Sequence, residues 1–411
     1  MRILIVYDCL FPHTVGGAER WYRNLAERLA ADGHEVTYLT LRQWDRGERP
    51  GVAGVRVRTA GPRMALYTGG RRRIAPPLIF GAGVLAHLLR HGRSYDVVHT
   101  ASFPYFSLLA AGLLRRAQRF RLVVDWHELW SREYWREYLG PVGGPIGWAV
   151  QRAGLRLRQR AFCFAELTAA RLREQGVRGE VELLEGEYAG SLQTPVPRAA
   201  GSEVVFAGRH IPEKRVPALV DAFAIVRERA PELRLVIYGD GPERPRVLGA
   251  IEAQQLGDVA RAPGFVDADE VAEGLARALC MVLPSRREGY GLVVVEAAAR
   301  GVPSIVVADP DNAATELVDE GENGFIAASA SPEDLADAIL RVRAAGPELR
   351  ERTAAWFERN AARLSLAGSL ERVAAVYARG AARASLRDRG SIRGDLIAPA
   401  VEPDEWEALG E

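Results

Sequence analysis

The stretch at residues 278–297 reads ALCMVLPSRREGYGLVVVEA and contains the three parts that decide the fold. An apolar run at residues 278–283 predicts a buried strand, a glycine-containing loop follows it, and a helix begins near Gly291. Glu288 lies in the loop and Glu296 lies about one turn into the helix. A carboxylate at the carboxyl end of a buried strand, beside free backbone N–H groups, suits the recognition of polyols and phosphates. The alternative is that Glu288 is solvated and Glu296 caps a helix turn.

Strands and helices alternate along the chain on both sides of this stretch. Apolar runs predict strands at residues 2–7, 35–40, 52–58, 95–99, 121–125, 162–167, 181–184, 203–207, 233–238 and 303–308. Apolar residues at helical spacing fill most of the intervals, for example at residues 21–31 and 216–229. Such alternation predicts parallel sheets with helices on both faces.

The pattern restarts after a segment rich in Pro and small residues at 193–201. We therefore predict an α/β fold with two doubly wound parallel-sheet domains, at residues 1–192 and 201–365. A helix at residues 366–385 is expected to pack back on the N-terminal domain, and a polar tail follows at residues 387–411. Ligands of such sheets bind at the carboxyl ends of the strands, so the predicted site is a cleft between the domains.

The composition is that of a globular protein without a membrane span. Of the 411 residues, 48% are hydrophobic and 26% are charged. No apolar run approaches the roughly 18–20 residues of a spanning helix. Met1 and Arg2 lead directly into a strand, so we expect no signal peptide. Cys9, Cys163 and Cys280 lie in or beside apolar runs without disulfide or zinc spacing, which indicates buried thiols in a reducing cytoplasm.

The net charge of +1 conceals two halves of opposite charge. Residues 1–200 hold 29 Arg against 18 Asp or Glu, whereas residues 201–411 hold 25 Lys or Arg against 35 Asp or Glu. Arginines cluster at residues 71–73 and 152–160, so the basic half suits an anionic acceptor or peripheral contact with the inner face of a membrane. The alternative is an ordinary charged surface. Because the arginines are dispersed without a recognition motif, we expect no nucleic-acid partner.

A candidate phosphate site follows the strand at residues 203–207. The sequence AGRHIPEKR at residues 207–215 contains Arg209 and Lys214, the single lysine of the chain. Gly208 in the same loop has no side chain, so a ligand can approach the backbone closely there. Two cations in such a loop suit a diphosphate. The alternative is that both are solvated near a helix start.

Glycines and a histidine mark further strand ends. Gly239 and Gly241 follow a strand of the second domain, where the backbone must approach a ligand closely. Gly16 and Gly17 follow the first strand and either admit a substrate or only turn the chain. His127 also follows a strand, where it can hydrogen-bond a sugar hydroxyl, assist proton movement or serve a structural role. The histidines have no metal-ligand spacing, so we expect no metal site.

Together these residues resemble the motifs of glycosyltransferase family 4. The resemblance covers residues 1 to about 380 and is stronger in the second half. It rests on Gly16-Gly17-Ala18-Glu19, His127, Gly208-Arg209, Glu213-Lys214, Gly239-Asp240-Gly241-Pro242, Glu288, Glu296, Glu316 and Asn323-Gly324. The resemblance implies a retaining hexosyltransferase of the GT-B fold, in which two Rossmann-like domains face each other across a cleft. It also implies a nucleotide-diphosphate sugar, of UDP or GDP, as the donor.

The resemblance implies a role for each matching residue. Arg209 and Lys214 match the pair that holds the donor diphosphate, and Glu288 matches the glutamate beside the donor-sugar hydroxyls. Glu296 matches the glutamate that grips the ribose, and His127 matches a histidine close to the donor sugar. We therefore expect Glu288, His127, Lys214 and Arg209 to be catalytic. The expected donor-binding residues also include Gly16, Gly17, Gly208, Gly239, Gly241, Phe265, Val266, Gly289, Tyr290, Gly291, Leu292 and Glu296.

The resemblance also implies the reaction. A sugar would pass to a hydroxyl of a glycan, a lipid-linked acceptor or a small natural product, with retention of configuration. No cofactor and no bound metal are expected, because cationic side chains would neutralise the leaving diphosphate. Two alternatives stay open, namely a nucleotide-sugar epimerase of the same fold and a non-catalytic nucleotide-sugar-binding protein.

Overall fold

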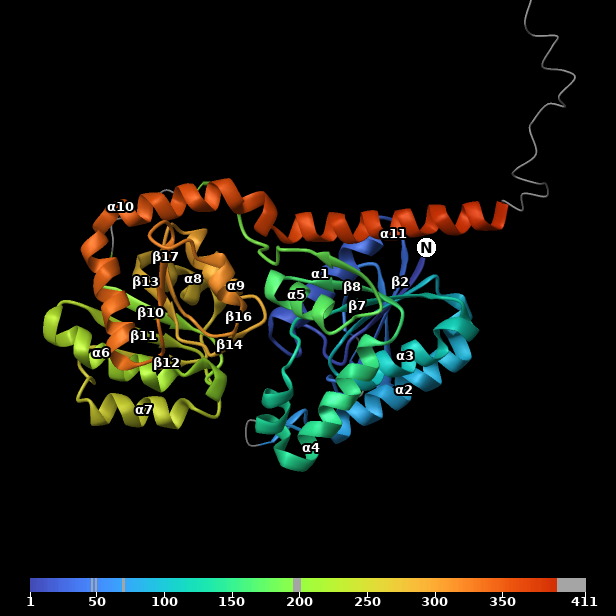
Figure 1. The fold of residues 1–411 in the computed structure, drawn as a ribbon, viewed down its shortest axis with the longest axis horizontal. Helices are drawn as coiled ribbons and strands as arrows, with labels where there is room; N and C mark the ends of the chain where they lie inside the picture. Colours follow the sequence, from blue (N-terminus) through green and yellow to red (C-terminus); the bar gives the residue numbers. More distant parts are fainter. Residues whose placement is uncertain (46, 49, 69–70, 195–200, 390–411) are drawn as a thin grey trace, which may run out of the picture. The chain divides into compact units, whose positions relative to one another are not determined.

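The strands of the first half form one parallel sheet. The computed structural model describes residues 1–45, 47–48, 50–68, 71–194 and 201–389, and the strand order of this sheet is β3-β2-β1-β6-β7-β8-β9 (Figure 1). The bounds are β1 Arg2–Val6, β2 Glu35–Leu41, β3 Val55–Gly61, β6 Val97–Ala101, β7 Arg121–Asp125, β8 Gln159–Cys163 and β9 Gly179–Leu183. All neighbouring strands are parallel, as predicted. Outside this sheet, β4 (Tyr67–Thr68) pairs antiparallel with β5 (Arg71–Arg72).

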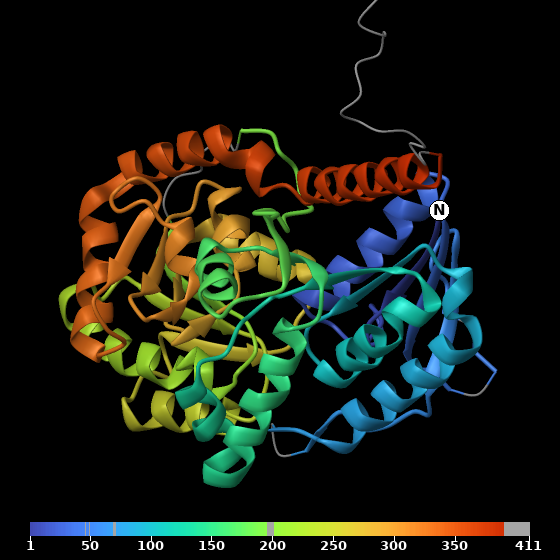
Figure 2. The same cartoon turned by 45° about the vertical axis from the view of Figure 1, so that its right-hand side comes forward.

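Helices connect the strands of this sheet. Their bounds are α1 Gly17–Ala31, α2 Ala75–His91, α3 Tyr105–Gln118, α4 Arg132–Leu155 and α5 Glu166–Glu174, with a 3-10 turn at Gly92–Ser94. Figures 1 and 2 show α2 and α3 side by side, and the two helices contact each other along their length. The strand order reverses between β1 and β6, so the loops after these strands flank the switch point where doubly wound sheets bind ligands.

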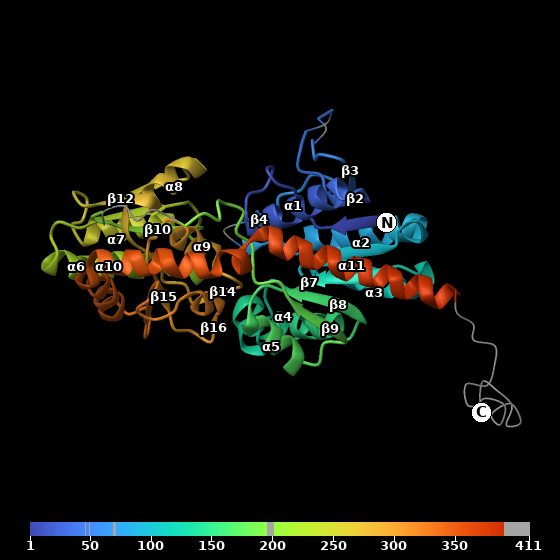
Figure 3. The same cartoon turned by 90° about the horizontal axis from the view of Figure 1, so that it is seen from above.

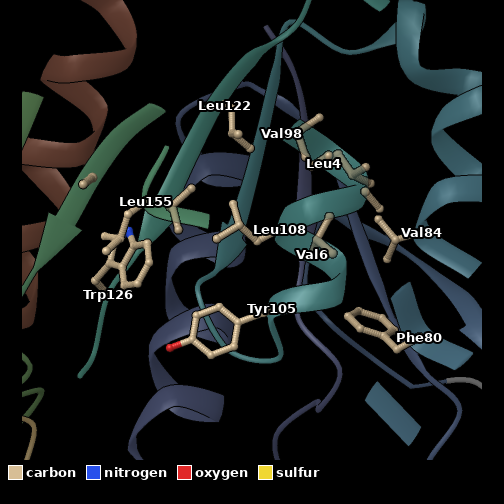
Figure 4. Close-up of a cluster of buried hydrophobic side chains, with 14 of the residues drawn as sticks. Leu4, Val6, Phe80, Val84, Val98, Tyr105, Leu108, Leu122, Trp126 and Leu155 are labelled. Carbon is tan, nitrogen blue, oxygen red and sulfur yellow. The ribbon is translucent and has the colours of Figure 1, made fainter. Parts of the chain in front are cut away.

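The sheet and the helices α2 and α3 share a buried apolar core. Buried members of this core include Leu4, Val6, Phe80, Val84, Val98, Tyr105, Leu108, Leu122, Trp126 and Leu155 (Figure 4). In Figure 4, Leu108 of α3 lies between Val6 and Leu155. Because helices cover the sheet, its central strands β1 and β7 are continuous apolar runs, which is why the sequence predicted them. Trp126 follows β7 directly, so the core fixes the start of the loop that carries His127.

The second half forms another parallel sheet, in the order β12-β11-β10-β13-β15-β17. The bounds are β10 Glu203–Ala207, β11 Arg234–Tyr238, β12 Ala260–Gly264, β13 Ala278–Leu283, β15 Ser304–Val307 and β17 Gly324–Ala327. Again every neighbouring pair is parallel. The order reverses between β10 and β13, so the loops after these two strands flank a second switch point.

Helices surround this sheet as well. Their bounds are η2 Pro212–Lys214, α6 Val216–Arg229, α7 Arg244–Ala253, α8 Ala268–Arg277, α9 Leu292–Ala298, η3 Ala313–Leu317, α10 Pro332–Leu364 and α11 Leu366–Arg389. Figures 1 and 3 show α6 and α10 side by side, in agreement with their contacts. Within α10, Gly346 has φ 62 and is followed by Pro347, which kinks the helix there. Three residues separate β13 from the short strand β14 (Arg287–Glu288), which pairs with β16 (Asp311–Asn312).

Several elements differ from the sequence prediction, which also lacks β17 and α8. No helix was predicted within residues 126–160, but α4 occupies most of this segment, with Gly140 in a non-helical conformation. A strand was expected at residues 162–167, whereas β8 ends at Cys163 and α5 begins at Glu166. The edge strand β12 was not predicted, because its sequence ARAPG contains a charge and a proline that edge strands tolerate.

The domain boundaries stay a prediction, although each sheet lies within one predicted domain. Residues 1–370 form one compact unit and the rest of α11 belongs to another, so the expected packing of residues 366–385 also stays a prediction. Most of the predicted linker, at 195–200, and the tail at 390–411 lie outside the described residues. Within the described ranges, none of the helices has the length and apolarity that crossing a membrane requires.

Candidate functional site

The loops after β10 and β13 meet at the switch point of the second sheet. Lys214 ends the short helix η2 after β10, and Glu288 lies in β14 after β13. The Lys214 Nζ donates a hydrogen bond to Glu288 Oε1, and the two side chains are 17% and 11% exposed. The structure therefore joins the residue predicted to bind the diphosphate to the residue predicted to bind the sugar, although the two are 74 residues apart in the chain.

Glycines bring the loops after β10 and β11 into contact. The Gly208 N–H donates to Tyr238 O at 3.2 Å. Gly239 has φ 115, and a Cβ there would lie 1.9 Å from Gly208 O. Gly241 has φ 153, and its Cβ would lie 2.4 Å from His210 O. Only glycine fits at these two positions, because the backbones of the two loops lie against each other there. The approach of these glycines to a ligand stays a prediction.

Arg209 lies in the loop after β10, next to Gly208. Its side chain is exposed, and it forms no hydrogen bond or ion pair with any of the described residues. Lys214 by contrast is already paired with Glu288. An exposed guanidinium at the carboxyl edge of a parallel sheet is suited to hold a phosphate oxygen by two N–H groups.

The Gly289–Tyr290–Gly291 loop contacts the first half of the chain. A Cβ on Gly289 would lie 2.5 Å from His127 O, so the loop lies directly on the backbone that follows β7. The Tyr290 hydroxyl donates to Glu185 O at 2.7 Å, and burial raises its pKa. Gly291 has φ 102 and precedes α9, a backbone conformation that favours glycine. The structure thus places His127 beside the loop that carries Glu288.

His127 presents a buried nitrogen that the described protein groups leave unpaired. Its ring stacks on Phe164, with centroids 5.1 Å apart and planes 2° apart. Nδ1 lies 3.8 Å from Glu187 Oε1, while Nε2 is buried without a hydrogen-bond partner among the described residues. Burial lowers the pKa of His127, although Asp125 and Glu128 oppose that shift. A neutral imidazole held in this way can exchange a hydrogen bond with a ligand hydroxyl.

Glu296 lies about one turn into α9, as predicted. It is the fifth residue of that helix and is half-buried. Burial raises its pKa, while Arg300 and Arg20 lower it. Arg300 donates to the backbone carbonyl oxygen of Glu296 at 2.6 Å rather than to its carboxylate. The carboxylate is therefore available to hydroxyl groups.

Two further predicted glycines, Gly16 and Gly17, lie at the start of α1. Among the described residues, a Cβ on Gly17 would have one neighbour within 4 Å, namely Glu187 Oε2 at 3.8 Å. At Gly16 a Cβ would meet the Glu19 side chain, which can move. Phe265 follows β12 and is 74% exposed, which is unusual for a ring of its size without a partner surface.

The sequence did not identify Arg287, although it lies inside the opening stretch. Its side chain is 5% exposed, and its Nε donates to Glu128 Oε2 at 2.8 Å. The guanidinium lies 4.0 Å from the Tyr134 ring centroid and 5.0 Å from that of Trp130. The Tyr134 hydroxyl in turn donates to Glu213 Oε1 at 2.9 Å. Within the aromatic segment at residues 126–138, Trp126 and Trp135 are therefore part of the first-half core, while Trp130 and Tyr134 also contact Arg287 of the second half.

Two residues of the family motif have structural partners. Glu316 accepts hydrogen bonds from the backbone N–H groups of Glu166 and Leu167, at 2.7 and 2.6 Å, and so caps the N-terminus of α5. Asn323 donates to Leu317 O at 2.8 Å. Beyond Tyr290, a pocket of about 530 Å³ is lined partly by these elements, but it lies away from the Lys214 loop.

Two family models match the chain one after the other. The Glycosyltransferase Family 4 model matches residues 15–184. The glycosyl transferases group 1 model matches residues 198–356. The first match lies in the first half of the chain and the second match lies in the second half.

The sequence is similar to those of a kanosaminyltransferase and a glycogen synthase. Alpha-D-kanosaminyltransferase of Streptomyces kanamyceticus is 33% identical over 151 residues, which are 37% of this chain and 38% of that protein. The alignment thus spans well under half of that relative. Glycogen synthase of Mycobacterium tuberculosis (strain ATCC 25618 / H37Rv) is 28% identical over 370 residues, 84% of this chain and 85% of that protein.

Solved structures share the fold over most of the chain. Sucrose-phosphate synthase from Thermosynechococcus elongatus matches with a TM-score of 0.75 and 23% identity, over 93% of this chain and 99% of that one. Anabaena HepE, solved in complex with UDP and glucose, matches with a TM-score of 0.69 and 18% identity, over 92% of this chain and 99% of that one. The fold is therefore GT-B, as the sequence predicted.

Proposed function

Since this chain belongs to glycosyltransferase family 4, we propose that it moves a sugar from a nucleotide-diphosphate sugar to an acceptor hydroxyl, with retention of configuration and without a bound metal. The observation that carries the proposal is the Lys214–Glu288 pair at the switch point of the second sheet. A cation and a carboxylate side by side suit the two ends of one glycosyl phosphate. UDP or GDP is the proposed nucleotide, and the complex of HepE with UDP supports that class.

The surrounding residues supply the rest of the donor site in this proposal. Arg209 and Lys214 hold the diphosphate, and Glu288 accepts hydrogen bonds from sugar hydroxyls. Glu296 accepts from the ribose hydroxyls, since its carboxylate is not engaged by Arg300. The exposed ring of Phe265 stacks on the base.

The proposed chemistry needs charge stabilisation at the leaving diphosphate. Arg209, Lys214 and the backbone N–H groups near Gly291 neutralise the negative charge that develops as the glycosidic C–O bond breaks. The acceptor hydroxyl attacks from the same face, and its proton passes to the departing phosphate oxygen. His127 positions the sugar through the ring nitrogen that the described protein groups leave unpaired.

The acceptor and the location of the enzyme are also proposals. The solvent-exposed side of α4 carries Leu139, Val142 and Ile146, which are 36%, 77% and 62% exposed. Arg132 and Arg136 are exposed on the same helix. Glu133 and Glu137 are exposed there as well, so the membrane argument rests on the exposed apolar side chains, and we propose a lipid-linked acceptor approached from the cytoplasmic face. The three buried free cysteines support a reducing compartment.

The test is a panel of UDP, GDP, dTDP and ADP sugars, screened first by thermal shift and then by nucleotide release with and without acceptors. Release that depends on an acceptor supports transfer, and the anomeric configuration of the product, read by NMR, tests retention. Isomerisation of the donor without an acceptor would point to an epimerase instead. Binding without turnover under every condition would point to a non-catalytic protein. Lys214→Ala should abolish turnover whether the protein is a transferase or an epimerase. The control is Arg229→Ala, which replaces an exposed arginine at the far end of α6 and should leave turnover unchanged.

A further inference from the structure

Glu187 lies in a segment whose backbone is fixed on both sides. The Gly186 N–H donates to Ser369 Oγ at 3.1 Å, and the Tyr188 N–H donates to Leu364 O at 3.1 Å. A Cβ on Gly186 would lie 2.4 Å from Ser365 O, so this segment is pressed against the junction of α10 and α11. The backbone that carries Glu187 is therefore held rigidly, and the side chain has a defined direction.

That direction is toward the first-half loops of the donor site. Glu187 Oε1 lies 3.8 Å from His127 Nδ1. Glu187 Oε2 lies 3.8 Å from the position of a Cβ on Gly17. Its side chain is only 10% exposed. The carboxyl group thus lies between the start of α1 and the loop that follows β7. These are the two parts of the first half that are proposed to contact the donor.

The described protein groups do not satisfy this carboxyl group. His127 is the nearest basic side chain, at a distance beyond hydrogen-bond length, and no Lys or Arg side chain among the described residues approaches Glu187 within 4.0 Å. A buried carboxyl group without a cation is expected to hold its proton. Burial, with a contribution from Asp125, accordingly raises the pKa of Glu187 to about 8. A neutral carboxyl group can both donate and accept a hydrogen bond, and it does not repel a diphosphate.

We propose that Glu187 is a further donor-site residue, whose carboxyl group hydrogen-bonds a hydroxyl of the transferred sugar beside His127. This inference rests on the proposed function, because it takes a nucleotide-diphosphate sugar as the ligand. It goes beyond that function because the carboxyl group recognises the sugar and not the nucleotide. Glu187 and Glu288 approach this site from different segments, so two carboxyl groups share the recognition of one polyol.

The experiment separates sugar recognition from nucleotide recognition. UDP, GDP, dTDP and ADP, and the glucose and mannose conjugates of each, are titrated calorimetrically into the parent protein, Glu187→Leu and Glu187→Gln. For Glu187→Leu we expect at least a tenfold loss of affinity for the preferred nucleotide sugar, with less than a twofold change for the free nucleoside diphosphate. Glu187→Gln keeps the shape and one donor and one acceptor, so its loss should be smaller. Equal losses for sugar-bearing and free nucleotide, or no loss in either variant, overturn the inference.

A pH profile distinguishes hydrogen bonding from a purely structural role. Besides Glu187, the titratable groups that face this position are His127, Asp125 and Tyr290. The pKa of His127 is lowered and that of Tyr290 is raised, so neither changes charge near pH 8. Affinity of the parent for the nucleotide sugar should fall as pH rises past about 8, while Glu187→Gln should give a flat profile there. If affinity depends on pH in the same way in the parent and in Glu187→Gln, the inference about Glu187 is overturned but the proposed function is not. A parent that binds none of the four nucleotides overturns the proposed function as well.

Discussion

Removal of Arg287 should destabilise the contact between the loops of the two sheets. The Arg287 guanidinium donates to Glu128 at 2.8 Å and lies over the rings of Tyr134 and Trp130. A hydrogen bond between charged groups contributes about 1.5–3 kcal/mol. Each cation–π contact adds about 0.5–1 kcal/mol. Because the Glu128 side chain is 35% exposed, water can solvate it after the substitution, so we expect a loss of about 3 kcal/mol for Arg287→Ala.

The adjacent arginine provides a matched control. Arg286 donates to Glu137 at 2.7 Å, but these side chains are 39% and 55% exposed. An exposed ion pair contributes less than about 1 kcal/mol, so Arg286→Ala should change stability little. Both variants remove one arginine from the same loop, and therefore the same net charge.

Two assays measure the difference. For a chain of this size, 1 kcal/mol shifts the melting temperature by roughly 1 °C, so Arg287→Ala should melt about 3 °C lower and Arg286→Ala within about 1 °C of the parent. Hydrogen exchange should accelerate in peptides from residues 126–138 only in Arg287→Ala. Equal shifts in the two variants would refute the reasoning, as would a double-mutant cycle that finds no coupling between Arg287 and Glu128.

Three further predictions concern other features. Gly289→Ala places a methyl group 2.5 Å from a backbone carbonyl oxygen and should lower stability by about 1–3 kcal/mol; Gly249→Ala, in open space on α7, should be neutral or stabilising, and equal denaturation midpoints would contradict this contrast. The folded-state pKa of Glu187 lies above its ordinary value, so the folded protein holds a proton that the unfolded chain loses between about pH 4.5 and 8, and stability should fall across that window. Glu187→Gln should remove that fall, which at its upper bound is roughly 5 kcal/mol, and an unchanged slope of melting temperature against pH would count against the burial of this group. Val142→Asp should weaken sedimentation with vesicles that contain anionic lipid, whereas Leu113→Asp on α3 should not, and a parent that never sediments would exclude the membrane proposal.

Much of the fold followed from the sequence because buried parallel strands are continuous apolar runs. The strands β1, β7, β10 and β13 were all predicted on that basis, within a few residues. The helix α4 was not, because its sequence contains Gly140, Pro141 and Pro145, and such residues are typical of loops. The helix forms around them because Trp135 and neighbouring residues are buried in the core.

The candidate site was predictable only in part. Lys214, Glu288 and the glycines lie in the segments that follow strands, and strand ends meet at one edge of a parallel sheet. Arg287 and Glu187 follow no such rule. The partner of Arg287 is 159 residues away in the chain, and the property that marks Glu187 is its burial between two loops. Neither the distance nor the burial is contained in a local pattern.

The central claim is that the loop after β10 binds the diphosphate of the donor. Arg209 tests it most directly, because its side chain is exposed and bonds to none of the described residues, so its removal should leave the fold unchanged. The measurement is a calorimetric titration of UDP and GDP into the parent, Arg209→Ala and the control Arg229→Ala. We expect at least a tenfold loss of affinity for the preferred nucleotide in Arg209→Ala and no change in Arg229→Ala. Unchanged affinity in Arg209→Ala, with a parent that binds the nucleotide, would contradict the account.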